Sequence, residues 1–425
     1  MGGFSAVIAA PEATGSRSIR LCSAIRSDPN DCVQYNAISL PAARRRIQKF
    51  HYHPLQYPDQ HVVLTTPQRL LCRRMSWTRS RIEGSLRHHQ GEDNMQSRRL
   101  FMGATAAFSA ALAGQPRAAS PTVVSSDRIL SLFHALPGET AIRIRAPAAN
   151  DKPEIDIASN ASAQLFVGSA IKTFILAESL AQADTPDVVH TLTTTQLQLN
   201  ETVWSADSAT FNPPNLIGVV SQRTALEAMI LHSDNTATDM SIRHAGASNV
   251  RRFVQAAGLH RTMIPESTRS FFGYLLGARD YQTFTWADLQ AAAPSPMVNP
   301  PLNKVETLAS SADDLVSYYS RALQGTFFRN PQTLNEFRRI LSLGDAIWLV
   351  PLPLGASAFC KGGSIDVPGF HCLCVAGGMF VNQRWVCFAL IINWQAAAET
   401  DPATAAAFAS AASQAMGMVI GALSA

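Results

Sequence analysis

The spacing of hydrophobic residues predicts strands at both ends of residues 120–425 and helices between them. Residues 139–147 and 154–158 alternate apolar and polar side chains, as the two strands of a hairpin do. Strand-like segments return only near the end of the chain, at 358–360, 371–376 and 385–393. Strands from the two ends can pair in one antiparallel sheet. We therefore predict an α+β fold with an all-helical subdomain inserted into it.

Helical spacing dominates the middle of the chain. In residues 166–182 the apolar side chains, among them Ile171 and Phe174, recur at the interval of a helix. The segment Thr224-Ala225-Leu226-Glu227 has the sequence of a capping box and predicts a helix that runs to His232. Further helices are expected at 127–135, 248–257, 311–323, 331–343 and 403–423.

The charge is unevenly distributed along the chain. The net charge of the 425 residues is +4, but residues 1–94 alone carry 13 Lys and Arg against 7 Asp and Glu. From residue 120 onward, 19 Lys and Arg stand against 24 Asp and Glu. The basic balance therefore comes from the front of the chain, and nothing in residues 120–425 favours a nucleic-acid partner.

A second start of the chain is indicated at Met95. The run Ser97-Arg98-Arg99-Leu100-Phe101-Met102 precedes an apolar stretch at 103–114, and Pro116-Arg117-Ala118-Ala119 offers small residues for cleavage. This order is typical of a twin-arginine export signal. We predict that residues 1–94 are an over-extended gene start or a disordered leader, that 95–119 are the signal, and that 120–425 are a periplasmic domain. The protein would meet the membrane only during export. A basic tail on a cytoplasmic protein is the alternative.

The segment Ser169-Ala170-Ile171-Lys172 places a serine and a lysine three residues apart at the start of an apolar helix. Residues at this spacing share a helix face, so the amine is expected near the hydroxyl. Burial disfavours the charged form of a lysine, and a neutral amine can activate a serine nucleophile. Backbone N–H groups at the helix start can stabilise a developing oxyanion. The pattern favours nucleophilic catalysis.

Two more short motifs follow in order. Ser233-Asp234-Asn235 begins 64 residues after Ser169, and Lys361-Gly362-Gly363-Ser364 begins 128 residues further on, at the end of a predicted strand. Each alone is compatible with an ordinary turn or a surface lysine. Together, in this order and on these elements, the three match the motif set of serine β-lactamases and penicillin-binding proteins.

On these residues, nearly all of 120–425 resembles the class A β-lactamases and the related penicillin-binding serine hydrolases, the DD-peptidases. Residues 224–237 are especially similar to the family's S-D-N helix and loop. The resemblance implies the β-lactamase/transpeptidase-like fold, in which helices flank a five-stranded antiparallel sheet. It implies a hydrolase that needs no cofactor or metal. The expected partner is a small-molecule β-lactam, peptide or ester, and the protein is expected to be a monomer.

The resemblance also implies catalytic roles. Ser169 would form the acyl-enzyme, and Lys172 would accept or relay its proton. Ser233 would pass a proton to the leaving group. The backbone N–H groups of Ser169 and Ser364, which follows Gly363, would form the oxyanion hole.

The resemblance assigns substrate binding to two further residues. Asn235 would hydrogen-bond the side-chain amide of the substrate, and Lys361 would attract a substrate carboxylate. The chain departs from the family at Gly362, where a hydroxyl-bearing residue is usual. That departure removes a donor to the carboxylate, for which Ser364 can compensate.

A second departure concerns deacylation. Class A enzymes carry a glutamate on a loop after the S-D-N helix, and Thr268 occupies the aligned position here. Glu266, two residues earlier, is the candidate replacement base. Residues 269–306 are roughly 25 residues longer than the family loop, and long loops are often functional. Within them, 291–301 contain four prolines and predict a loop.

Four cysteines lie in the predicted terminal strands: Cys360, Cys372, Cys374 and Cys387. Cys360 can form a disulfide with Cys372 or Cys374 across a hairpin, or all four can be small buried residues. Their spacing does not indicate a metal site. Three functions remain open: a divergent β-lactamase or related esterase or peptidase, a penicillin-binding or sensor protein with little turnover, and an inactive relative.

Overall fold

The central sheet combines strands from both ends of the domain, as predicted. In this computed structural model, residues 4–7, 20–23, 125–149, 152–293 and 295–424 are described. The sheet has five antiparallel strands in the order β4-β3-β11-β10-β9. Their bounds are β3 Glu139–Ala146, β4 Ile155–Ser159, β9 Ser357–Val367, β10 Phe370–Val381 and β11 Arg384–Trp394. The predicted fold class is confirmed.

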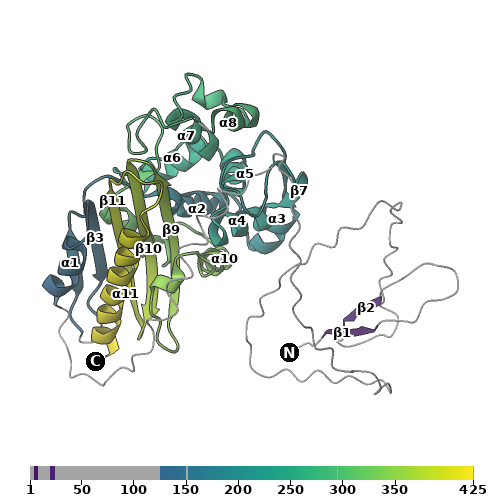
Figure 1. Ribbon diagram of the computed structural model, residues 1–425. Helices are drawn as coiled ribbons and strands as arrows, with labels where there is room; N and C mark the ends of the chain where they lie inside the picture. The colour runs from purple at the N-terminus through teal and green to yellow at the C-terminus, as the bar shows by residue number, and fades with distance from the viewer. Residues whose placement is uncertain (1–3, 8–19, 24–124, 150–151, 294, 425) are drawn as a thin grey trace, which may run out of the picture. The chain divides into compact units, whose positions relative to one another are not determined.

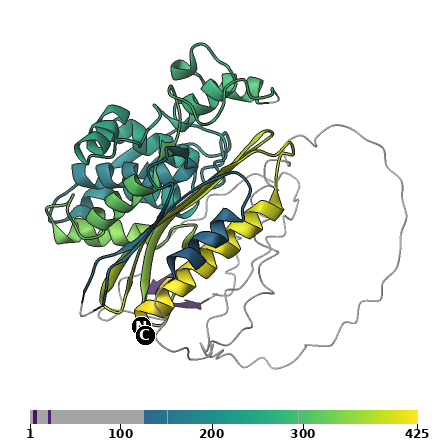
Figure 2. The same ribbon diagram turned by 90° about the vertical axis from the view of Figure 1, so that its left-hand side faces the viewer.

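Both faces of this sheet are covered by helices. Along β11, Phe388 and Leu390 belong to one hydrophobic core, whereas Ala389 and Ile391 belong to another. Successive side chains of a strand point to opposite faces, so this alternation separates two cores. Helices α1 (Ser126–His134) and α11 (Pro402–Ser424) lie on one face, and the helical subdomain lies on the other (Figures 1 and 2).

The helical subdomain lies between β4 and β9 in the sequence. Its α-helices are α2 Lys172–Gln182, α3 Val188–Thr194, α4 Gln222–Leu231, α5 Asn235–Ala245, α6 Ala247–Ala256, α7 Thr268–Leu275, α8 Trp286–Ala292, α9 Ala312–Ala322 and α10 Pro331–Leu341. Its 3-10 turns are η1 Gly168–Ile171 and η2 Tyr281–Thr283; η3 Ile347–Leu349 lies just before β9. Its strand pairs are β5 (Leu165–Phe166) with β8 (Ala309–Ser310), and β6 (Gln196–Leu199) with β7 (Gly218–Ser221).

Two local predictions were wrong. The segment 166–182 is not one helix, because β5 and η1 precede α2. Helix α4 begins before the proposed capping box: Ser221 is its N-cap, and the Ser221 hydroxyl accepts a hydrogen bond from the Thr224 amide at 3.1 Å. Instead of capping the helix, the Glu227 carboxylate pairs with Arg223 and Arg339.

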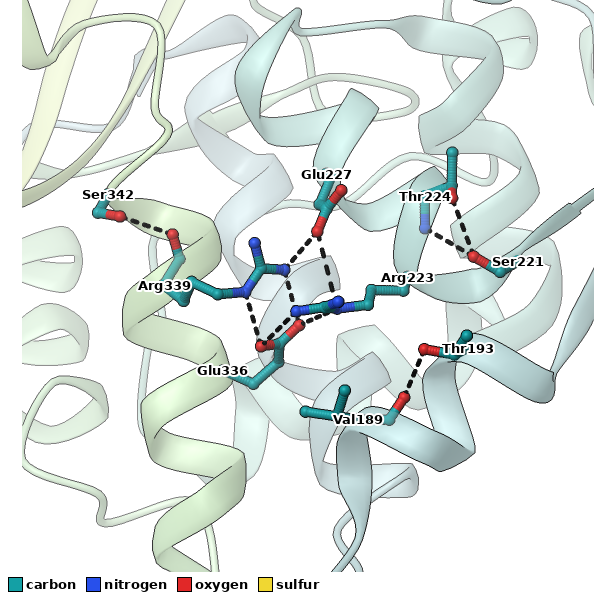
Figure 3. A network of polar contacts seen from close by, with 9 residues as sticks. All are labelled: Val189, Thr193, Ser221, Arg223, Thr224, Glu227, Glu336, Arg339 and Ser342. Atoms are coloured by element: carbon teal, nitrogen blue, oxygen red, sulfur yellow. Dashed lines mark hydrogen bonds and ion pairs between the residues drawn. The ribbon is translucent and has the colours of Figure 1, made fainter. Parts of the chain in front are cut away.

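Helices α4 and α10 are joined by a network of four charged residues (Figure 3). At its centre the buried Glu336 carboxylate accepts hydrogen bonds from Arg223 Nε at 2.8 Å and from Arg339 Nε at 2.7 Å. Burial raises the pKa of Glu336, but the hydrogen bonds from Arg339 and Arg223 outweigh it and hold the pKa below its usual range. The network therefore stabilises the helix pair most strongly when Glu336 is ionised.

Replacing Glu336 with glutamine should lower the free energy of unfolding by about 2 kcal/mol at pH 7, because charge-assisted hydrogen bonds are lost. The folded pKa of Glu336 lies below its unfolded value. Its contribution is thus present above the unfolded pKa and disappears as the pH falls through the folded one. Denaturant unfolding of both proteins at pH 7 and pH 3 tests this. Exposed Glu399→Gln is the control, and an equal loss at both pH values would contradict the prediction.

Helix α11 is the one described helix that is long and apolar enough to cross a membrane by length and composition. Half of its most apolar window is buried inside the protein. Phe408, Ala412, Met416 and Val419 belong to the hydrophobic core that α11 shares with α1 and the sheet. These contacts are those of a core helix.

The extended segment 269–306 contains α7, η2 and α8 rather than one open loop. Arg269 fastens it to the preceding subdomain by donating hydrogen bonds to the carbonyls of Glu201, Thr202 and Trp204. The rings of Trp204 and Trp286 meet edge to face, 6.0 Å apart. The segment thus supports the loop that leads from Trp204 toward the S-D-N motif.

The front of the chain forms a separate unit, Met1–Leu86. Within it, β1 (Phe4–Val7) and β2 (Arg20–Ser23) pair antiparallel. The predicted export signal at 95–119 lies outside the described residues. The second start at Met95 and the periplasmic location stay predictions.

Candidate active site

Strand β9 lies directly against the turn that carries Ser169. A Cβ atom added to Gly363 would lie 1.9 Å from the Val167 carbonyl oxygen and 2.9 Å from the Ser169 nitrogen. Gly168 has φ +52°, and a Cβ there would lie 2.9 Å from the Ser364 nitrogen. Because neither glycine has a side chain, the two backbones meet. The amide nitrogens of Ser169 and Ser364 therefore lie on adjoining backbone segments.

Lys172 begins α2 and is fully buried. Its Nζ donates to the Ser233 carbonyl at 2.5 Å, the Ser233 Oγ at 3.3 Å and the Asn235 Oδ1 at 2.7 Å. Among the described hydrogen bonds of Lys172, none reaches Ser169, which lies half-buried three residues earlier in η1. Catalytic hydrogen bonds are often long before substrate binds, so this geometry is compatible with proton transfer.

The environment of Lys172 favours its neutral form. Burial is the largest cause, and the charge of Lys361 adds to it; together they lower the pKa of Lys172 to about 7. Asp234, Asp345 and Asp239 act in the opposite direction. A substantial fraction of Lys172 is therefore neutral near pH 7 and able to accept a proton.

The S-D-N loop places its serine between the two lysines. Ser233 has φ +54°, and its Oγ lies 3.3 Å from Lys172 Nζ and 3.2 Å from Lys361 Nζ. Asp234 stabilises this conformation. Its carboxylate caps α5 by accepting a hydrogen bond from the Ala237 amide, and it accepts another from the Phe211 amide. The structure thus brings residues of all three motifs together through one hydroxyl.

Asn235 connects the site to a segment that the sequence did not single out. Its Nδ2 donates to the Ala206 carbonyl at 3.0 Å, and the Thr236 amide donates to Ser208 Oγ at 2.8 Å. Between these anchors lies Asp207, with φ +54° and an exposed side chain. The pKa of Asp207 is raised above its usual value by desolvation, although the charge of Lys172 acts in the opposite direction. No motif signals this carboxylate, because the fold alone brings it near Lys172.

Lys361 is also fully buried and pairs with a residue that sequence analysis missed. Its Nζ lies 2.6 Å from Asp345 Oδ2, and it also donates to the Gly362 carbonyl at 2.9 Å. Asp345 lies 16 residues before Lys361, in the loop between α10 and η3, where nothing in the local sequence marks it.

Glu266 does not join this group among the described residues. Its half-exposed carboxylate pairs with Arg251 at 3.0 Å, and its backbone amide donates to Glu306. Thr268, at the position aligned with the family glutamate, is buried, and its hydroxyl donates to Asp239 Oδ1 at 2.7 Å. Burial raises the pKa of Asp239 to about 6, against the hydrogen bonds from Thr268. The carboxylate near this position is thus that of Asp239, whose Oδ1 already accepts hydrogen bonds from the amide and the hydroxyl of Thr268.

The four cysteines of the terminal strands are buried and free. The register places Cys360 opposite Gly377, Cys374 opposite Gly363 and Cys372 opposite Ile365. The disulfide expected as one alternative is therefore wrong, because neither partner faces Cys360 across the strand pair. Within the described residues, no group of three or more His, Cys, Asp or Glu side chains is arranged to hold a metal ion.

A cavity of about 280 Å³ lies elsewhere on the protein. Its lining includes Arg145 of β3, Arg321 of α9 and Trp385 of β11, and none of the three motifs contributes to it. Its lining offers no activated nucleophile, since Cys387 is buried and burial raises its pKa to about 12. The motif cluster is the better candidate for chemistry.

Comparison with solved structures supports the fold. A class A β-lactamase from Bacteroides cellulosilyticus DSM 14838 is 17% identical, with a TM-score of 0.52 over 69% of this chain and 96% of that one. A class A β-lactamase from Mycobacterium abscessus is 14% identical, with a TM-score of 0.51 over 71% and 99%. PBP-A is 17% identical, with a TM-score of 0.50 over 70% and 95%.

Comparison with family models identifies the family. No curated protein matches the chain in a sequence comparison. The model described as "Beta-lactamase enzyme family" matches residues 125–416, which include all three motifs and the whole sheet. The chain therefore belongs to the β-lactamase enzyme family.

Proposed function

We propose that this protein is an exported serine hydrolase that opens the amide of a β-lactam through an acyl-enzyme on Ser169. One observation carries the proposal: Ser233 Oγ lies between Lys172 Nζ and Lys361 Nζ, beside the contact of β9 with the Ser169 turn. This arrangement supports a reaction in which Ser169 is the nucleophile, the buried amine of Lys172 is the base and the Ser233 hydroxyl is the proton relay, as acyl transfer requires.

Acylation would proceed as follows. Ser169 Oγ attacks the carbonyl carbon while its proton passes to neutral Lys172. The amide nitrogens of Ser169 and Ser364 stabilise the oxyanion. The carbon–nitrogen bond then breaks, and the leaving nitrogen takes a proton from Ser233, which Lys172 replenishes through its contact with the Ser233 hydroxyl. Asn235 orients the acyl side chain. Water must then attack the ester to release Ser169.

A second function is favoured by the deacylation region. Thr268 stands where class A enzymes carry their glutamate, and Glu266 pairs with Arg251. A protein that acylates readily and hydrolyses the ester slowly, like a penicillin-binding protein or a peptidase or esterase relative, fits these contacts. The two functions share the first half of the reaction and differ in the lifetime of the ester.

Intact-mass measurement with benzylpenicillin should show one adduct per chain in the wild type and none in Ser169→Ala. An adduct that decays within minutes supports a β-lactamase, and one that persists for hours supports the second function. Glu266→Gln should leave this lifetime unchanged within about twofold, because removing an exposed ion pair changes little. A long-lived adduct only in Glu266→Gln would restore Glu266 as the base. Full labelling of Ser169→Ala would refute the nucleophile.

A further inference from the structure

All three donors of Lys361 are used inside the protein. A lysine ammonium has three N–H donors and no acceptor. Lys361 Nζ contacts Asp345 Oδ2 at 2.6 Å, the Gly362 carbonyl at 2.9 Å and Ser233 Oγ at 3.2 Å. With its side chain fully buried, Lys361 has no spare donor for a substrate carboxylate.

Asp345 is held in this position by two glycines. Its Oδ1 accepts a hydrogen bond from the Gly362 amide at 3.0 Å. A Cβ at Gly362 would lie 3.1 Å from Asp345 Oδ1, and one at Gly344 would lie 1.8 Å from the Cys360 carbonyl oxygen. The loop thus approaches β9 where side chains are absent. The Asp345 carboxylate thus lies beside Gly362, where the family usually has a hydroxyl-bearing side chain.

The strand beside β9 in the described sheet supplies no replacement lysine or arginine. Strand β10, which pairs with β9, contains neither Lys nor Arg, and its residues opposite Lys361 and Ser364 are Ala376 and Leu373. Elsewhere in the site, desolvation raises the pKa of the Asp207 carboxyl, whereas the charge of Lys172 acts to lower it. The positive charge of Lys361 is therefore matched by the Asp345 carboxylate at 2.6 Å and is not left unpaired for an incoming anion.

We propose that Asp345 makes this site prefer acyl donors whose leaving group carries no carboxylate, that is, neutral or cationic esters and amides. The proposal rests on the acyl transfer proposed above and ranks its substrates: penicillins, whose leaving nitrogen is attached to a carbon that bears a carboxylate, are acylated more slowly than donors with a neutral leaving group. An incoming carboxylate must share Lys361 with Asp345, and like charges at short range repel strongly in a partly buried site. Asp345 is a positioning residue that acts through Lys361.

Two phenylacetylglycyl thioesters test the proposal, one releasing thioglycolate and the other thioglycolamide. Water or Ser169 cleaves the same thioester bond in both, and the released thiol is measured. We expect wild-type kcat/KM to be about tenfold higher for the amide, a difference of about 1.4 kcal/mol. Asp345→Asn should shift the kcat/KM ratio about tenfold toward the thioglycolate ester, because the positive charge of Lys361 then has no carboxylate paired with it. Asp366→Asn is the matched control: Asp366 lies on β9 with Lys361 but pairs with His371, so the ratio should stay unchanged.

The outcomes separate the two levels of the proposal. A wild-type preference for the thioglycolate, or an unchanged ratio in folded Asp345→Asn, overturns the selectivity while acyl transfer stands. Two results together would overturn both the function and the selectivity: wild type cleaves neither thioester faster than Ser169→Ala does, and no penicillin adduct forms. If Asp345→Asn does not fold, wild type still decides: 0.5 M NaCl should reduce the preference for the amide through screening, and a preference independent of salt counts against the proposal.

Discussion

Replacing Lys172 with methionine should slow acylation of Ser169 by about 10³-fold, since a positioned base contributes 10²–10⁴-fold. In the wild type the acylation rate should rise with pH, with its midpoint near 7. The direction follows from the base: Lys172 accepts a proton only when neutral, and its pKa is lowered to about 7 by burial and by Lys361. Above that pH the neutral form dominates.

The rate constant is measured by intact mass over pH 5–9 with benzylpenicillin. Lys304→Met is the matched control, because Lys304 is exposed and outside the three motifs, and its profile should follow the wild type. A wild-type rate that is flat across this range would show that a carboxylate, not Lys172, takes the proton. Such a result would leave Ser169 as nucleophile and shift the base to another residue.

Replacing Gly363 with alanine should abolish acylation and destabilise the domain. The new Cβ would lie 1.9 Å from the Val167 carbonyl oxygen and 2.7 Å from the Ala170 nitrogen. The contacting atoms are backbone, so β9 and η1 must separate. Overpacking of this kind costs up to about 3 kcal/mol. Loss of an oxyanion donor reduces rates by about 10²–10³-fold.

Thermal unfolding and adduct formation measure the two effects of Gly363→Ala. Gly421→Ala is the control: this helix glycine has no atom within 4 Å of an added Cβ, so alanine should be neutral or stabilise by up to about 1 kcal/mol. A Gly363→Ala protein with wild-type melting temperature and labelling rate would mean that the backbone contact of β9 with η1 is not required for chemistry.

The fold was predictable because its signals are local. Alternation in 139–147 and in the last strands, and helical spacing between them, indicate the elements before any contact is known. Ends and caps were harder. A single hydroxyl, Ser221, caps α4, although Thr224 had the better sequence pattern. The pairing register of the strands could not be predicted from the sequence. That register places Cys360 opposite Gly377 and so excludes the disulfide.

The candidate site was predictable only where chemistry lies in contiguous motifs. Ser169, Lys172, Ser233 and Lys361 are recognisable by spacing and order. Asp345 lies on a loop with no pattern of its own, and tertiary packing alone brings it to Lys361. Glu266 shows the converse, since proximity in sequence to the expected position gave it no described contact with the motif residues.

The order of strands in the sheet has a consequence for folding. Strand β11 lies between β3 and β10, and its pairing joins Ile142 to Leu390. Contacts between residues so distant in sequence form late and make folding slow. Until β11 emerges from the ribosome, β3 and β4 present an unpaired edge that favours aggregation. A chain terminated before Arg384 would lack the strand that joins the two halves, so this domain must reach its fold after synthesis is nearly complete.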